Sequence, residues 1–307
     1  MSRQVYKAPA NHLRSTCRSL DRDLFPRDRC QLARYWLAHH SDLFHTNHCF
    51  NNELPLTVSQ HGRGGTSDTQ RDTSLYYDYA AASDYIIVYP QGLACDQGTA
   101  WQGPTYACPD VNDVYFVADV LSYLEDNFCI DESRIYASGK SNGGGFVDTL
   151  ACSDVGDKFA AFGMAAAALY TDTSLGSCNK KRAILEAHGD SDHTIPSAGG
   201  EALGGPIPNI EDWVSWWGER DCGTGEVETC VEQKEGYQIE TLSCKGGLSD
   251  VVAHYQLDAP AAHCWPNTEG DNYDSKKYPQ GCGNSRALDF TAVVLDWFAK
   301  WDLESAP

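Results

Sequence analysis

The segment from Ser138 to Gly145 reads Ser-Gly-Lys-Ser-Asn-Gly-Gly-Gly and directly follows a strand-like run at residues 134–137. Its G-x-S-x-G pattern predicts a sharp turn between a strand and a helix, with the hydroxyl of Ser141 exposed at the turn. Glycines two residues before and after Ser141 let the strand and the helix pack closely there. A serine hydroxyl is a useful nucleophile only where a base takes its proton. The rest of the chain must therefore supply that base.

From Leu54 onward, apolar runs alternate with amphipathic segments. The expected strands span residues 54–60, 85–89, 134–137, 159–168, 183–188, 238–244 and 251–257. The expected helices span residues 66–83, 112–128, 143–152, 210–220 and 287–300, the first with Ser67 and Asp68 at its cap. Strands that alternate with helices predict a mainly parallel central sheet with helices on both faces. We assign residues 54–307 to one such domain.

The first 53 residues differ in composition from the remainder. They hold eight Lys or Arg and five Asp or Glu, whereas the remaining residues hold 15 Lys or Arg and 38 Asp or Glu. The segment shows one plausible helix, residues 29–39, and little strand pattern. Its opening residues 1–11 lack the apolar core of a signal peptide. We therefore treat residues 1–53 as an atypical N-terminal extension that replaces the original opening segment.

The formal net charge of the chain is −20, which argues against nucleic-acid binding and favours a neutral substrate. No run of about 18 apolar residues is present, so we expect no membrane span.

The 13 cysteines form no C-x-x-C pair, and disulfides in an oxidising compartment are the better interpretation. The plausible pairs are Cys95–Cys108, Cys152–Cys178, Cys264–Cys282, Cys129–Cys49 and one pair among Cys222, Cys230 and Cys244.

Two further residue types complete the chemistry that Ser141 needs. Asp190 and Asp192 both follow the expected strand 183–188, where a loop can aim a carboxylate at a histidine. We prefer Asp192, with Asp190 as the alternative. His263 follows the strand 251–257 and can reach over the sheet, whereas His254 lies inside that strand. The order Ser141, Asp192, His263 is that of α/β-hydrolases.

A tetrahedral intermediate also needs N–H donors for its oxyanion. We expect one from Asn142, which begins the helix after the turn, and a second from Arg63 in the glycine-rich loop 61–65.

Trp101 and Trp265 are candidates for an aromatic substrate-binding wall. The cluster His39, His40, His45, His48 and Cys49 matches no metal-site spacing. We expect no metal and no cofactor.

Six motifs carry a resemblance to a known family over residues 54–301. They are HGRGG at 61–65, YPQG at 89–92, NDVYFVADVL at 112–121, GKSNGGG at 139–145, HGDSDHTIP at 188–196 and HCWP at 263–266. The chain resembles fungal feruloyl esterases of carbohydrate esterase family 1, together with acetylxylan esterases and polyhydroxybutyrate depolymerase-like esterases. The resemblance implies that Ser141 is the nucleophile, Asp192 the acid and His263 the base.

The resemblance further implies a secreted α/β-hydrolase that releases ferulate or related hydroxycinnamates from plant cell-wall polysaccharide. Its substrates are then feruloylated arabinoxylan or small phenolic esters. We expect the protein to bind neither nucleic acid nor a membrane, and we expect a monomer. The alternatives are an acetylxylan esterase, a polyhydroxyalkanoate depolymerase-like esterase, and an inactive carbohydrate-binding relative.

Overall fold

The structure is a computed structural model that describes residues 5–7, 36–38, 53–170, 178–282 and 285–307. Its strands are β1 Val5–Lys7, β2 Trp36–Ala38, β3 Leu54–Gln60, β4 Ile86–Tyr89, β5 Leu93–Cys95, β6 Gly98–Ala100, β7 Ile130–Lys140, β8 Ala161–Ala165, β9 Ala183–Gly189, β10 Gly200–Ala202, β11 Gly205–Ile207, β12 Val227–Lys234, β13 Tyr237–Cys244 and β14 Val252–Leu257. Its helices are α2 Ser67–Ser74, α3 Asp113–Asn127, α4 Asn142–Ala151, α6 Ile210–Cys222, α7 Tyr273–Lys277 and α8 Phe290–Ala299.

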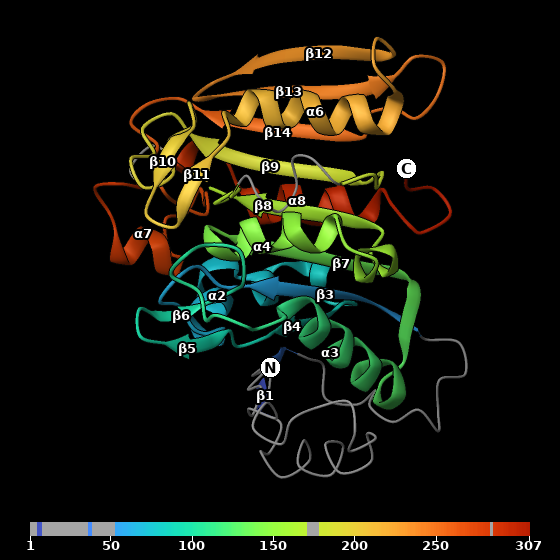
Figure 1. Cartoon of the computed structure of the whole chain (residues 1–307), viewed down its shortest axis with the longest axis vertical. Coiled ribbons are helices and arrows are strands. Elements are labelled where there is room, and N and C mark those ends of the chain that lie inside the picture. The colour runs from blue at the N-terminus through green and yellow to red at the C-terminus, as the bar shows by residue number, and fades with distance from the viewer. Residues whose placement is uncertain (1–4, 8–35, 39–52, 171–177, 283–284) are drawn as a thin grey trace.

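Ten of the described strands form one sheet in the order β1-β2-β4-β3-β7-β8-β9-β14-β13-β12 (Figure 1). The six central strands, from β4 to β14, pair in parallel. Strands at both edges pair antiparallel. The mainly parallel sheet expected from the alternating pattern is therefore confirmed, with antiparallel strands added at each edge.

Helices cover both faces of this sheet (Figure 1). On one face, Asp148 of α4 accepts hydrogen bonds from Trp213 and Trp217 of α6 at 3.2 and 3.1 Å. On the other face, Thr291 of α8 donates to the carbonyl oxygen of Ser74 in α2 at 2.6 Å. The central strands are buried between these layers, as expected for a sheet covered on both sides, and β4 and β8 read as continuous apolar runs.

Sequence-based expectations about local structure were wrong in two segments. The helix expected over 66–83 ends at Ser74, because Leu75 adopts a left-handed conformation with φ 51°, and short 3-10 turns follow. Its N-cap is Thr66, whose hydroxyl accepts from the Thr69 amide. Residues 36–38 of the helix expected over 29–39 form β2, and β1 and β2 join the sheet across the expected boundary at residue 53. The rest of that helix lies outside the described residues.

Four disulfides connect described residues: Cys95–Cys108, Cys152–Cys178, Cys222–Cys244 and Cys264–Cys282. All four agree with the pairs expected from the sequence, and Cys230 is left as an exposed free thiol. Cys129 is also disulfide-bonded, and its expected partner Cys49 lies outside the described residues. Within the described part of the chain, no helix is both long and apolar enough to cross a bilayer.

Candidate active site

Ser141 stands at the turn between β7 and α4, with φ 58° and ψ −123°. A positive φ is unusual for a residue with a side chain and marks a strained turn held by its surroundings. The Ser141 amide donates to the Ala165 carbonyl at 2.9 Å, which ties the turn to β8. A Cβ added at Gly139 would lie 2.5 Å from the carbonyl carbon of Gly143, so only glycine permits this close packing.

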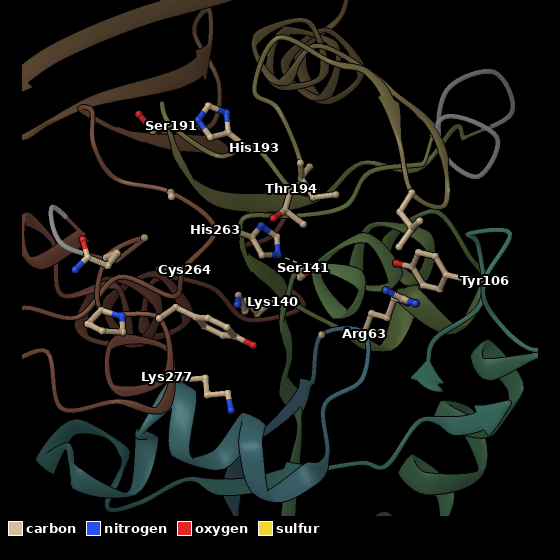
Figure 2. Close-up of a pocket in the computed structure, with 18 of the residues that line it drawn as sticks. Arg63, Tyr106, Lys140, Ser141, Ser191, His193, Thr194, His263, Cys264 and Lys277 are labelled. Atoms are coloured by element: carbon tan, nitrogen blue, oxygen red, sulfur yellow. Dashed lines mark hydrogen bonds between the residues drawn. The ribbon is translucent and has the colours of Figure 1, made fainter. Parts of the chain in front are cut away.

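The structure brings the predicted serine, histidine and aspartate together, although they follow three different strands. Figure 2 shows the His263 ring beside Ser141. His263 Nε2 lies 2.8 Å from Ser141 Oγ. His263 Nδ1 lies 2.7 Å from Asp192 Oδ2. With the Nδ1 proton directed to the carboxylate, Nε2 is left as an acceptor for the serine proton.

Asp192, and not Asp190, faces His263. The second carboxylate oxygen of Asp192 accepts from the amides of Thr194 and Ile195, both at 2.8 Å. Asp190 is exposed and accepts from the side chain of Gln256 at 2.7 Å. His254, the other late histidine, is buried in β14 with Nδ1 2.9 Å from a Glu186 oxygen.

The electrostatics of this trio suit proton transfer. Burial opposes the charge of Asp192, but hydrogen bonds and neighbouring imidazoles lower its pKa below the usual value. Burial, followed by the charge of Lys140, lowers the pKa of His263, against the raising effect of Asp192. These effects favour the neutral form of His263, which can accept a proton.

The loop that carries His263 is anchored on both sides. Cys264 is disulfide-bonded to Cys282. The next amide, of Trp265, donates to Asp274 Oδ2 at 2.9 Å. The same Asp274 oxygen lies 2.9 Å from Lys140 Nζ, one residue before the serine. These anchors fix the imidazole position relative to the turn.

Loop 61–65 passes directly over Ser141. A Cβ added at Gly62 would lie 3.2 Å from the Ser141 Cβ, so the backbone there approaches the serine closely. Burial lowers the pKa of His61 to about 4, and the neutral ring accepts from the Gly92 amide at 2.9 Å. The N–H groups of Arg63 and Asn142 belong to this loop and to the start of α4, which are the two places where we expected oxyanion donors.

The expectation that Trp101 and Trp265 form a substrate-binding wall was wrong. Both are fully buried, and neither lines the pocket at Ser141. Trp101 stacks on Phe146 at 5.2 Å between ring centroids and donates to the His61 carbonyl at 2.9 Å. It supports loop 61–65 from below. Trp265 packs against Phe290 in the core and donates to Thr291.

The pocket above Ser141 has a volume of about 640 Å³. One wall of the pocket carries Tyr106 and Tyr170, which are edge-to-face at 6.1 Å with their hydroxyls 3.3 Å apart, and Tyr278 lies on the opposite side. Ile195 and Leu203 extend this wall. Sequence reasoning missed both tyrosines, although Tyr106 lies in the 95–108 loop expected near the site. Only their folded positions bring the two together.

Charge in the pocket differs from charge over the whole chain. Among the described residues, those that line the pocket include no Asp or Glu but do include Arg63, Lys140 and Lys277. Figure 2 shows Arg63 and Tyr106 on one side of Ser141 and Lys277 on the other. The Arg63 guanidinium lies 4.9 Å from the Tyr106 ring centroid. Sequence reasoning also missed Lys140, which lies within the serine motif itself.

No group of His, Cys, Asp and Glu within the described residues could hold a metal ion. The histidine cluster at 39–48, with Cys49, lies outside those residues.

A family model described as the prolyl oligopeptidase family matches residues 71–199, a span that contains Ser141 and Asp192. Feruloyl esterase B of Piromyces equi is 29% identical over 208 residues, covering 63% of this chain and 37% of that protein. A probable feruloyl esterase C of Aspergillus niger is 29% identical over 158 residues, covering 50% of this chain and 54% of that protein.

The chain is similar to fungal feruloyl esterases. The resemblance predicted from the six motifs is thus confirmed, although the chain spans only about half, or less, of the length of these curated relatives. Among solved structures, an acetyl xylan esterase from Aspergillus awamori superposes with a TM-score of 0.55 at 13% identity, covering 82% of this chain and 94% of that one. This likeness concerns the fold, which is that of the α/β-hydrolases.

Proposed function

We propose that this protein is a serine carboxylic-ester hydrolase that releases ferulate or a related hydroxycinnamate from plant cell-wall polysaccharide. The observation that carries the proposal is the continuous chain from Ser141 Oγ through His263 to Asp192, at 2.8 and 2.7 Å. It lies at a pocket of about 640 Å³ with a tyrosine wall. Similarity to proteins named feruloyl esterases supports the choice of acyl group.

In this proposal the reaction proceeds through an acyl-enzyme. His263 Nε2 takes the proton of Ser141 as its Oγ bonds to the ester carbonyl carbon. The tetrahedral intermediate collapses, the carbon–oxygen bond to the alcohol breaks, and His263 returns the proton to that alcohol. Water then repeats the sequence and releases the acid. Asp192 orients the imidazole and stabilises its protonated form in both halves.

The backbone N–H groups of Arg63 and Asn142 are the proposed oxyanion donors. Removing one such donor typically lowers kcat by about 10²–10³-fold. The support of loop 61–65 by Trp101 and neutral His61 keeps the first donor in place. The positive end of α4 assists the second.

The acyl group is proposed to lie against Tyr106 and Tyr170. Edge-to-face aromatic walls suit a flat phenolic ring, and the paired hydroxyls give that wall a polar edge for ring substituents. An acetyl ester is the competing substrate, since it needs only the serine, the histidine and the oxyanion donors. A panel of methyl ferulate, sinapate, caffeate and coumarate beside an aryl acetate separates the two.

We also propose that the protein works outside the cell as a monomer, on feruloylated polysaccharide or small phenolic esters and without a cofactor. Four disulfides among the described residues support an oxidising compartment. Size-exclusion chromatography coupled to light scattering tests the monomer.

The deciding experiment replaces the nucleophile. Ser141→Ala should abolish ferulate release from methyl ferulate and prevent labelling by a fluorophosphonate probe. Ser83→Ala, at an exposed serine away from the pocket, is the matched control and should retain both. Hydrolysis that survives in Ser141→Ala contradicts the assignment of Ser141 as the nucleophile. If the wild-type protein is neither labelled by the probe nor active on any ester, the protein is an inactive relative of these esterases.

A further inference from the structure

Behind Asp192 lies a cluster of buried ionisable side chains that the proposed reaction does not use. Glu186, His188 and His254 are 0%, 1% and 3% exposed. Glu186 and His188 are two residues apart on β9, so their side chains share one face of the strand. His254 of β14 is the register partner of Glu186 in the neighbouring strand. Burying charges is unfavourable unless they are paired, so this cluster requires a reason.

His188 has oxygen acceptors at both ring nitrogens. Its Nδ1 lies 3.0 Å from Glu186 Oε1. Its Nε2 lies 2.7 Å from the Ile195 carbonyl oxygen. A neutral imidazole carries one N–H and can satisfy only one of these acceptors, whereas the imidazolium satisfies both. With Glu186 ionised, the contacts therefore favour the protonated ring.

The electrostatic balance agrees with the contacts. Burial would lower the pKa of His188, but the charge and hydrogen bond of Glu186, with a further contribution from Asp192, raise it to about 9. Burial would raise the pKa of Glu186, yet the two neighbouring histidines lower it. A buried carboxylate and a buried imidazolium thus sustain each other's charge.

This positive ring faces the proposed catalytic acid. His188 Nε2 lies 3.5 Å from Asp192 Oδ2, the same oxygen that accepts from His263 at 2.7 Å. The Ile195 segment connects the two residues, because its amide donates to Asp192 Oδ1 and its carbonyl accepts from His188. His188 therefore supports both the charge and the orientation of Asp192.

We infer that protonated His188, held by Glu186, is a positioning residue that keeps Asp192 ionised and aimed at His263, and so extends ester hydrolysis to acidic pH. The inference rests on the proposed function of the trio. A second positive charge beside the Asp192–His263 pair opposes uptake of a proton by that pair. Its removal makes protonation easier, so the acid limb of the pH profile should move to higher pH.

Other charged groups near this pair stay constant in the comparison. Lys140 and Asp274 act on His263 from the serine turn and from α7. The charged groups that face Asp192 are His263 and His188, and those that face Glu186 are His188 and His254. A shift of the acid limb that occurs only in variants of Glu186 and His188 therefore reports on this cluster.

The first experiment measures kcat/KM against pH for an aryl acetate and methyl ferulate. His188→Gln removes the charge and retains an N–H donor. The acid limb of its kcat/KM profile should lie about one pH unit or more above that of wild type. At a given acidic pH, kcat/KM should therefore be about tenfold lower than in wild type, with little loss at the plateau. Glu186→Gln should reproduce the shift, because His188 loses its counter-charge, and the double variant should add nothing further.

His254→Gln is the matched control, because it contacts Glu186 but not Asp192. Its acid limb should coincide with that of wild type. A uniform loss of activity with an unmoved limb in a folded His188→Gln, or an equal shift in His254→Gln, overturns the inference. Circular dichroism and thermal melting establish that each variant is folded.

A second measurement needs neither a variant nor an ester substrate. NMR titration of ¹⁵N-labelled histidines in the wild-type protein should find His188 protonated at both nitrogens at pH 7, and His263 neutral. A neutral His188 at pH 7 overturns the inference whatever the activity. If His188 is charged but no ester is hydrolysed, the proposed function has failed, and the inferred effect on hydrolysis fails with it.

Discussion

The Nζ atom of Lys140 lies 2.9 Å from Oδ2 of Asp274, which ties the residue before Ser141 to the segment that anchors the His263 loop. Lys140 is 11% exposed and Asp274 3%. Such a pair contributes little net stability by itself, but either partner alone would be a buried unpaired charge. The contact therefore acts as a clamp between two parts of the site that are distant in sequence.

Lys140→Met should break this clamp and leave Asp274 unpaired. We expect a loss of about 3 kcal/mol in the free energy of unfolding, the scale typical of half-removed buried pairs. Because the charge of Lys140 lowers the pKa of His263, its removal should also raise that pKa and move the acid limb of kcat/KM upward. Urea melts and pH–rate profiles measure the two effects. Lys140→Arg keeps the charge and should leave the acid limb unmoved.

The tyrosine pair makes a prediction about acyl preference. Tyr170→Phe and Tyr106→Phe each remove one hydroxyl of the pair that is 3.3 Å apart. We expect the ratio of kcat/KM for methyl ferulate over methyl cinnamate to fall by about tenfold, because a polar group that recognises the substituted ring is lost. Hydrolysis of an aryl acetate should be unchanged.

Tyr278→Phe is the control for this series. Tyr278 lines the same pocket beside Lys277, and its ring is half exposed. An equal loss of selectivity in Tyr278→Phe would place the acyl group on the opposite side of Ser141 from the one we propose.

The contrast between these tyrosines and the serine trio shows what a sequence can reveal. Ser141, Asp192 and His263 each follow a recognisable buried strand, and parallel strands present their carboxyl ends at one edge of the sheet. Their meeting is thus predictable from strand order alone. Trp265 lies in the HCWP motif and Trp101 follows YPQG along the chain. Whether such a side chain faces the pocket or the core depends on packing, and both face the core.

Other differences arise from tertiary contacts that local patterns do not encode. Tyr106 and Tyr170 are separated by α3, β7, α4 and β8, and no local spacing relates them. The helix expected over 66–83 stops because Leu75 adopts a left-handed conformation that helical periodicity does not reveal. The exposed edge strand β12 is polar and was missed because it lacks a buried face.

Removing the disulfide beside His263 should affect activity as well as stability. Cys264 and Cys282 close a loop of 18 residues. The double variant Cys264→Ser/Cys282→Ser should unfold about 2–4 kcal/mol more easily. It should also lose kcat at temperatures where it remains folded, because the loop that carries His263 is released. Calorimetry and steady-state kinetics at low temperature separate the two effects.

Cys222→Ser/Cys244→Ser provides the comparison, since that bridge closes a similar loop of 22 residues between α6 and β13. It should lower stability by a similar amount and leave kcat near the wild-type value. Equal losses of kcat in the two double variants would contradict a specific role for the Cys264–Cys282 bridge.

Asp221 makes the last prediction, which concerns stability and pH. Its side chain is 5% exposed, and Oδ1 accepts from the Arg182 amide at 2.8 Å, while Oδ2 has no partner among the described residues. Burial raises its pKa to about 8, against the lowering effects of Arg182, Lys181 and Arg220. The folded state therefore binds a proton that the unfolded state releases near pH 4. The resulting stabilisation is complete below pH 4 and is lost as pH rises toward 8.

Asp221→Asn removes this dependence while it keeps the acceptor for Arg182. At pH 4 the variant and wild type should unfold with similar free energies. At pH 8 the variant should be more stable by about 1–3 kcal/mol, because no carboxylate must then be buried. Glu219→Gln, at an exposed position of the same helix, should show no such divergence in urea melts. Parallel pH curves for Asp221→Asn and wild type would mean that Asp221 ionises in the folded protein as readily as in the unfolded chain.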